Sequence, residues 1–346
     1  MEGSDGGFER LKELFNSGQV SELLGIEIKS VQGNQELDNL LQRILEAESL
    51  DFLTTLRIAG FDPSEDLFGV SLREAQLSGI DLSNSNLSLS SLRRGDLSQS
   101  KLSGANLSNA DLSYANLSNA DLSHADLTNT NLSYANLANA NLSYANLSHA
   151  NLTNASLQES NLSRTNLTDA NLTSSILIMA NIFMSILSRS NFTEANLSQA
   201  NLGGANMGES ILTRANLREA NLSAATLNHA NLEGANLENA YLFSATLMLT
   251  NLTGASLRKT NLIKANLFQS NLTDADCEEA DFTGASLEMS QLAGTSFENA
   301  KLVGARFEST IGLLPGTRRW LIQQGAIVRE LPGDSEPPPR YLPPSK

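Results

Sequence analysis

The side chains that most often do chemistry in proteins are scarce in this sequence, and their spacing keeps them apart. The 346 residues include three histidines (His124, His149 and His229) and one cysteine, Cys277. A catalytic or metal site needs unlike groups that converge on one spot, and a single cysteine provides neither a thiolate cluster nor a CxxC pair. The phosphate-binding pattern GxxxxGK and the dinucleotide-binding pattern GxGxxG are both absent from the sequence. We therefore expect no enzyme activity, no cofactor and no bound metal.

Composition indicates a folded chain with a large core. Hydrophobic residues make up 40% of the chain and charged residues 18%, with a net charge of −15. The sequence has no apolar run close to the ~20 residues of a membrane-spanning helix, and its first residues lack the pattern of a secretion signal. We expect a cytoplasmic protein without membrane contact. The absence of a basic stripe argues against direct nucleic-acid binding.

A five-residue repeat dominates the sequence. From Leu72 to Phe307 every fifth residue is large and apolar, which gives 48 consecutive positions, 41 of them leucine. Two residues before each large residue stands a small one (Ala, Ser, Thr or Gly), with Ile80 as the bulky exception. The residue between the two is mostly Asn or Asp, so that a typical unit reads A-N-L-S-N, as in residues 105–109.

A period of five fits neither a helix nor an extended strand. A helix would spread the leucines around its whole surface, and a strand would alternate them between its two faces. The chain must turn at each unit, and four units would close a square coil of 20 residues. A narrow interior then accommodates one large and one small side chain from each unit. With neighbouring coils ~4.8 Å apart, twelve coils would form a rod of roughly 58 Å.

The unit A-N-L-S-x resembles the A(D/N)LXX motif of pentapeptide-repeat proteins over residues 70–309. This resemblance implies an all-β solenoid, a right-handed quadrilateral parallel β-helix of about 12 coils. It also implies that the large and small residues point inward and the other three outward. Long uninterrupted members of the family are frequent in bacteria, including photosynthetic ones, so the resemblance favours a bacterial source.

Both ends of such a solenoid need a cap, because each end exposes apolar interior and unpaired backbone. The sequence divides into a helical N-terminal cap (1–69), the repeat (70–309), a C-terminal cap helix with a short strand (310–330) and a proline-rich tail (331–346). The helix is expected over residues 315–324, ended by Gly325, and the strand over residues 326–328. Trp320 and Leu321 on this helix are candidates for end-to-end self-association, which would give a homodimer.

Two groups of outward positions carry large apolar residues instead of small polar ones. The first cluster comprises Ile176, Ile178, Met179, Phe183, Met184 and Ile186, and the second comprises Tyr241, Phe243, Met248, Leu249, Ile263 and Phe268. A coil of 20 residues places Phe243 beside Ile263 and Met248 beside Phe268. Exposed apolar surface with Met and Phe is typical of contact sites. We therefore select as candidate partner-contact residues Ile178, Met179, Phe183, Met184, Phe243, Met248, Leu249, Ile263 and Phe268. Their partner would be another, unidentified protein or a second copy; a segment of the same chain that covers them, or no role at all, are the alternatives.

Aromatic side chains also recur at intervals of 20 residues. Tyr114 and Tyr134 should stack on one side of the coil, and His124, Tyr144 and Arg164 should form a column on another. Such columns can bind sugars or bases, but cross-strand stacking on a sheet surface is commoner.

The resemblance offers a second function, because some pentapeptide-repeat proteins mimic duplex DNA and modulate DNA gyrase. Residues 70–309 hold 21 acidic and 13 basic side chains, about one net charge per 7 Å of rod, whereas DNA carries one per ~1.7 Å. One local exception is the acidic group of Asp274, Asp276, Glu278, Glu279 and Asp281. We expect a non-enzymatic protein-interaction scaffold, with gyrase or topoisomerase modulation as the alternative.

Overall fold

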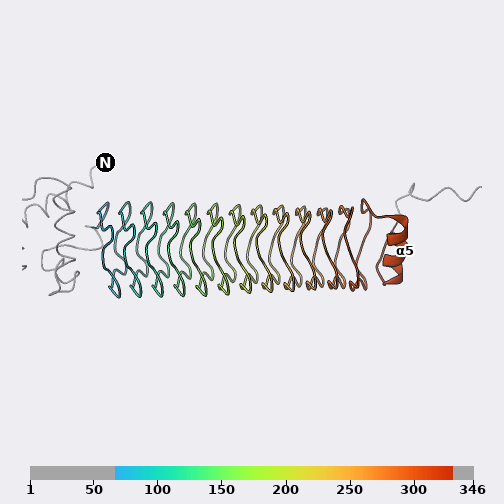
Figure 1. Ribbon diagram of the computed structural model, residues 1–346, viewed down its shortest axis with the longest axis horizontal. Helices are drawn as coiled ribbons and strands as arrows, with labels where there is room; N and C mark the ends of the chain where they lie inside the picture. The colour runs from blue at the N-terminus through green and yellow to red at the C-terminus, as the bar shows by residue number, and fades with distance from the viewer. Residues whose placement is uncertain (1–66, 330–346) are drawn as a thin grey trace, which may run out of the picture.

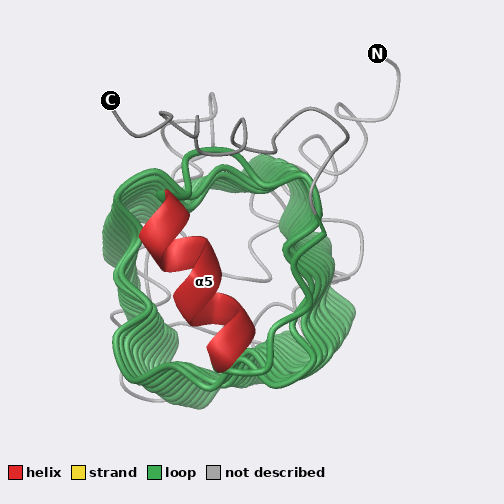
Figure 2. Ribbon diagram, turned by 90° about the vertical axis from the view of Figure 1, so that its right-hand side faces the viewer, coloured by secondary structure: helices red, strands yellow, loops and turns green. Residues whose placement is uncertain are grey.

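The computed structural model describes residues 67–329, which wind into a straight rod with a four-sided cross-section (Figures 1 and 2). Neighbouring coils are joined by isolated parallel bridges between residues 20 apart, from Ser71↔Ser91 to Gln291↔Ile311. The predicted coil of four five-residue units is therefore confirmed. Within the described residues, one helix, α5 (Pro315–Gln323), accompanies these bridges.

The interior of the rod is filled by the large and small residue of each unit. Leu147 and Ala145, for example, are 0% and 1% exposed, and all 48 large residues are buried. Where the small residue is Ser or Thr, its hydroxyl donates to a backbone carbonyl: Ser85 Oγ to Leu82 O and Thr130 Oγ1 to Leu107 O, both at 2.7 Å. These bonds offset the cost of burying a hydroxyl. The predicted inward pair is confirmed throughout the repeat, with Ile80 and Thr295 as the two small-position residues that are only partly buried.

Where a coil is followed by another, three backbone hydrogen bonds join each of its sides to the next coil. On the side that contains Leu147, the N–H groups of Leu147 and His149 donate to the carbonyls of Asn166 and Thr168 in the next coil, at 2.7 and 2.9 Å. In return, Asn166 N–H donates to Ala145 O at 3.0 Å. The later coil thus contributes two acceptors and one donor to each side.

Every corner of the rod has the same backbone conformation. The residue two positions after each large residue has a positive φ, from Gly69 to Ser309, with values of 55–71°. This left-handed region disfavours β-branched side chains. Accordingly, none of these corner residues is Val, Ile, Thr or Pro. Corner residues 20 apart stack into four columns along the rod.

The coil extends slightly beyond the predicted repeat. Leu67 and Val70 are 0% and 7% exposed and belong to the same core, and Ile311 still pairs with Gln291. The predicted helical cap over residues 1–69 lies, except for its last three residues, outside the described residues. The predicted tail over residues 331–346 lies wholly outside them.

The C-terminal helix was predicted over residues 315–324 and is confirmed as α5. Proline occupies its first turn, and Gly325, with φ 85°, follows its last residues. Ile327 then pairs with Arg306 in a parallel bridge, which confirms the short strand. Viewed down the rod, α5 lies across the end of the coil (Figure 2). Leu321 on α5 is 0% exposed and joins the core.

Candidate functional site

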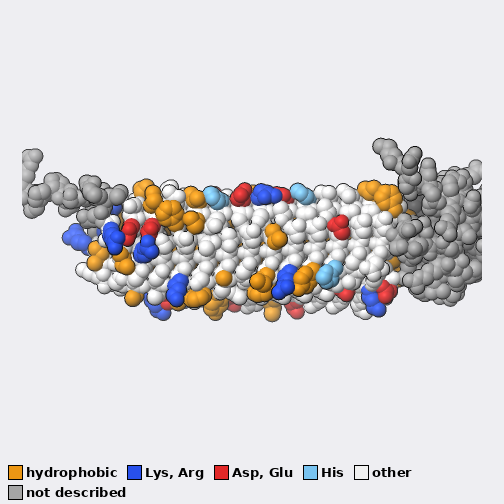
Figure 3. Space-filling view, turned by 180° about the vertical axis from the view of Figure 1, so that it is seen from behind, with side chains coloured by type: hydrophobic (Ala, Val, Ile, Leu, Met, Phe, Trp, Pro, Cys, Tyr) orange, Lys and Arg blue, Asp and Glu red, His pale blue; other side chains and the backbone are white. Residues whose placement is uncertain are grey.

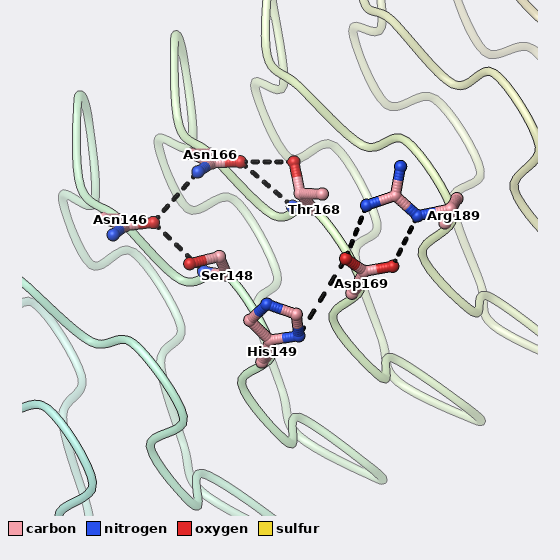
Figure 4. Close-up of polar contacts among 7 residues, drawn as sticks. All are labelled: Asn146, Ser148, His149, Asn166, Thr168, Asp169 and Arg189. Carbon is pink, nitrogen blue, oxygen red and sulfur yellow. Dashed lines mark hydrogen bonds and ion pairs between the residues drawn. The ribbon is translucent and has the colours of Figure 1, made fainter.

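On the polar surface of the rod, many Asn and Asp side chains bond to other residues of the rod. Asn166 shows the pattern: its Oδ1 accepts from the N–H of Thr168 at 3.1 Å and from the Thr168 hydroxyl at 2.6 Å. Its Nδ2 donates to Asn146 Oδ1 one coil earlier, at 3.1 Å (Figure 4). Five such hydrogen bonds join six consecutive coils in one ladder, from Asp121 through Asn141, Asn161, Asn181 and Asn201 to Asn221. A surface whose polar groups are already paired offers little to a ligand.

Charged residues on the corners pair with one another along the columns. Asp169 accepts two hydrogen bonds from Arg189, at 2.8 and 2.6 Å, and lies 3.9 Å from His149 Nδ1 (Figure 4). The hydrogen bond from Arg189 holds the pKa of Asp169 below its usual value. The same corner column carries His229 four coils from His149, whereas His124 belongs to another column.

The aromatic columns stack as predicted. The rings of Tyr114 and Tyr134 are parallel with centroids 4.8 Å apart, and those of His124 and Tyr144 are 5.0 Å apart. Arg164 completes the second column, since its Nη1 donates to the Tyr144 hydroxyl at 3.0 Å. Ring faces that already contact each other present mainly their edges to solvent.

The first cluster consists of apolar side chains that point outward from the rod and are exposed to solvent. Phe183, Met184 and Ile186 are 40%, 51% and 47% exposed, and Ile176 and Met179 are 41% and 54% exposed. Ile178 is half-buried. On the next coil, Gly203 lies beside the ring of Phe183. A Cβ added at Gly203 would lie only 3.3 Å from Phe183 Cδ2, so the ring packs closely over this glycine. The predicted outward position of all six residues is confirmed.

The second cluster lies nearer the C-terminus on two adjoining sides. Tyr241, Phe243 and Leu249 are 54%, 44% and 45% exposed, whereas Met248, Ile263 and Phe268 are half-buried. The predicted neighbours are confirmed by the register, since Ser244 N–H donates to Ile263 O and Leu249 N–H to Phe268 O, both at 3.0 Å. In the space-filling view most of the surface is neither charged nor apolar, and the apolar side chains form separate groups (Figure 3).

The two candidate self-association residues have different surroundings. Trp320 is half-buried and packs against the core, but Leu321 is fully buried beneath α5. The prediction that Leu321 contacts a second copy is therefore wrong, because this side chain fills the interior of the last coil. The exposed apolar side chain of α5 is Ile322, at 54% exposure. The helical spacing predicted the apolar face of α5 but not which of its residues would be turned toward the core.

The acidic group near the C-terminal end is largely paired. Arg258 bonds both Asp276, at 3.0 Å, and Glu278. Lys259 lies 3.8 Å from Glu279, and Lys301 lies 3.4 Å from Asp281. Four of the five carboxylates therefore have a cationic neighbour, and the local charge is much smaller than the sequence cluster suggested.

Within residues 67–329, no group of three His, Cys, Asp or Glu side chains is arranged to hold a metal ion. Cys277 is fully buried, and this burial raises the pKa of its thiol. No helix in this part of the chain is long and apolar enough to cross a membrane.

Comparisons with known proteins identify the repeat. The family model described as pentapeptide repeats matches eight times between residues 66 and 288. One similar solved structure is HetL, a pentapeptide repeat protein involved in heterocyst differentiation regulation from the cyanobacterium Nostoc sp. strain PCC 7120. It is 33% identical, covers 57% of this chain and 91% of its own, and has a TM-score of 0.53.

Two further solved structures are less similar in shape. A pentapeptide repeat protein from the Arabidopsis thaliana thylakoid lumen is 28% identical over 39% of this chain and 82% of its own, with a TM-score of 0.19. QnrB1, a plasmid-mediated fluoroquinolone resistance protein, is 18% identical over 52% of this chain and 92% of its own, with a TM-score of 0.35. No curated protein matched the chain.

Proposed function

The chain belongs to the pentapeptide-repeat family, and we propose that it is a non-enzymatic scaffold that binds another protein through its two apolar clusters. In this proposal the rod is a right-handed β-helix of about 12 coils in the cytoplasm of a bacterium. A helical cap at residues 1–69 and a cap helix with a short strand at residues 310–330 close its two ends. The repeat holds the contact side chains at fixed spacing, and the surrounding polar surface keeps other proteins away.

One observation carries the proposal: large apolar side chains are exposed in two groups on a surface that is otherwise small and polar. Eight of the twelve cluster residues are at least 40% exposed. Full burial of a Phe or Met side chain contributes about 1.5–3 kcal/mol. Because a few well-buried anchors dominate most protein interfaces, residues such as Phe183, Met184 and Phe243 suffice to define a contact site.

Affinity capture from the native cell tests this proposal. The variant combines Phe243→Ser, Met248→Ser and Phe268→Ser, and the matched control combines Tyr114→Ser and Tyr134→Ser in the polar part of the rod. Both variants keep every inward residue, so both should fold. The proposal predicts a protein that is captured by the native chain and by the control but not by the triple variant. Equal capture by all three proteins would contradict it.

The pairing of the acidic group favours a scaffold over a mimic of DNA. A duplex mimic needs dense uncompensated negative charge, and Arg258, Lys259 and Lys301 reduce it where it is densest. A DNA gyrase supercoiling assay distinguishes the two functions. The scaffold proposal predicts the same supercoiling rate with and without the protein, and inhibition or protection would favour the mimic.

We also propose self-association at the C-terminal end, but without Leu321 as a contact residue. With Leu321 buried, Trp320 and Ile322 are the apolar side chains of α5 that a second copy could reach. Light scattering of the native chain and of an Ile322→Ser variant tests this contact. A dimer that becomes a monomer in the variant supports a homodimer through α5, and a monomeric native chain rejects it.

A further inference from the structure

The last coil differs from all earlier coils because two of its sides are not covered by a following coil. Between Gly294 and Leu302, the four N–H groups that would bond a following coil, those of Gly294, Phe297, Asn299 and Leu302, form no hydrogen bond within the described residues. One coil earlier, the equivalent N–H groups of Asp274, Cys277, Glu279 and Phe282 all donate to this last coil at 2.8 Å. The carbonyls of Thr295 and Ala300 likewise lack the N–H that their equivalents, Ala275 and Ala280, accept. The two sides thus form an open β-edge.

The path of α5 explains why the edge is open. After Ile311 the chain crosses the end of the coil as a helix and does not follow the next two sides (Figure 2). It returns to the ladder afterwards, where Gly304 N–H donates to Gly325 O and Phe307 N–H to Ile327 O, both at 2.8 Å. The helix therefore covers the apolar interior but leaves the N–H groups of Gly294, Phe297, Asn299 and Leu302 without an acceptor within the described residues.

A cavity of about 510 Å³ lies between this edge and α5. The coil contributes Thr295, Phe297, Glu298 and Asn299 to its lining, and α5 contributes Gly316, Thr317 and Trp320. Its two aromatic residues, Phe297 and Trp320, suit an apolar or aromatic side chain. An extended segment along the edge would place alternate side chains toward this cavity.

The open edge is richer in donors than in acceptors, which restricts what can cover it. It presents four N–H groups and two carbonyls, as expected when each covering side contributes two acceptors and one donor. Proline retains its carbonyl but has no N–H, so a proline-rich segment matches this imbalance. Residues 330–346 contain six of the eight prolines of the chain.

This segment begins close to the edge and is long enough to cover it. The described chain ends at Arg329, whose Nε lies 3.5 Å from Glu308 Oε1 on the last coil. The 17 residues from 330 to 346 span roughly 53 Å at ~3.1 Å per residue in a polyproline conformation. Two sides of the coil take ten residues, as elsewhere in the repeat. The remaining seven can bridge from Arg329 to Gly294.

We propose that residues 330–346 lie along the open edge as a partial additional coil, with their carbonyls accepting from the four unpaired N–H groups. Tyr341, the aromatic residue of this segment, occupies the cavity between Phe297 and Trp320. The segment thereby closes the edge against pairing with a second copy or with another extended chain. This inference is independent of the apolar clusters and of the proposed partner.

Hydrogen exchange of the full chain, compared with a chain that ends at Arg329, tests the proposal. The N–H groups of Gly294, Phe297, Asn299 and Leu302 should exchange at least about tenfold more slowly in the full chain. The N–H groups of Asp274 and Glu279, which are bonded in both proteins, serve as internal controls. A third protein, in which a Gly/Ser linker of equal length replaces residues 330–346, should exchange like the shortened chain.

Equal exchange at the four N–H groups in the full and shortened chains would overturn the proposal. Protection that grows with protein concentration would also overturn it, because the edge would then be covered by a second copy. Tyr341→Ala adds a second readout: it should change the fluorescence of Trp320, the single tryptophan of the chain, in the full-length protein. Unchanged Trp320 fluorescence would contradict the placement of Tyr341 in the cavity.

Discussion

Two stretches of the rod, residues 131–170 and residues 241–268, have the same interior but different exteriors. Leu147 in the first and Leu247 in the second are both 0% exposed. The first stretch presents amide ladders such as Asn166 on Asn146, whereas the second presents Phe243 and Leu249 at more than 40% exposure. The comparison shows that two inward positions in five determine the coil. The other three can carry a binding surface without altering it, provided that the left-handed corner position carries no β-branched residue.

The largest expected effect tests whether the two interiors are equivalent. Leu147→Ala and Leu247→Ala each remove a fully buried side chain and should each lower the free energy of unfolding by about 2–5 kcal/mol. Hydrogen exchange of the neighbouring coils measures the loss locally, which suits a repeat protein whose coils can open separately. Losses that differ severalfold between the two sites would mean that the exterior contributes to packing after all.

A second prediction concerns the corners, which both stretches share. Asn139 has φ 59°, where a β-branched side chain is strained. Asn139→Val should therefore destabilise the rod by about 2 kcal/mol. Asn139→Gly, the matched control, should be close to neutral in the same denaturation experiment. If valine were tolerated as well as glycine, the left-handed corner could not explain the residues found there.

The amide ladder of the polar stretch gives a third prediction. Asn161 donates to Asn141 and accepts from Asn181, at 3.1 and 3.2 Å. Asn161→Asp loses the donor and places a carboxylate against the Asn141 oxygen, which should cost about 1 kcal/mol. Asp121→Asn is the control, because Asp121 starts its ladder and only accepts. Thermal denaturation should show that Asn161→Asp lowers stability more than Asp121→Asn does. A greater loss of stability in Asp121→Asn would refute the role of the ladder.

The smallest effect is expected at the charged corner of Asp169 and Arg189. Since pairing lowers the pKa of Asp169 below 3.8, its contribution to stability is complete above the unfolded pKa. It disappears as the pH falls through the folded pKa. Asp169→Asn should remove this acid-dependent contribution, and the loss of stability at neutral pH should be small because the pair is exposed. An NMR titration that placed the pKa of Asp169 at or above 3.8 would contradict the assignment.

Much of the architecture could be predicted from the sequence because the repeat leaves few alternatives. The period of five predicted a turn at every unit, and a coil of four units, as the resemblance implies, then placed Tyr114 against Tyr134 and Phe243 beside Ile263. The outward position of both clusters followed from the same rule. The helix after Pro315 and its end near Gly325 could be predicted from ordinary helix signals.

Other features depend on contacts that a periodic pattern does not contain. Leu321 was predicted to lie at the surface, but α5 is oriented so that this side chain packs against the core at the C-terminal end of the rod. The sequence indicated a tight turn in each unit but not which position would have the left-handed conformation, although one signal was present: no β-branched residue occurs at any of these positions. The pairing of Asp276 with Arg258 depends on side-chain directions, and the open β-edge between Gly294 and Leu302 depends on the path of α5.

The central claim is that a partner binds the apolar exterior and not the polar one, and site-specific photo-crosslinking in the native cell tests it most directly. A photoreactive residue would replace Met248 or, as the matched control, Ser148, which lies on the same side of the rod five coils away. The account predicts a covalent adduct with another protein from position 248 and none from position 148. Adducts from position 148 alone, or equally from both positions, would contradict it.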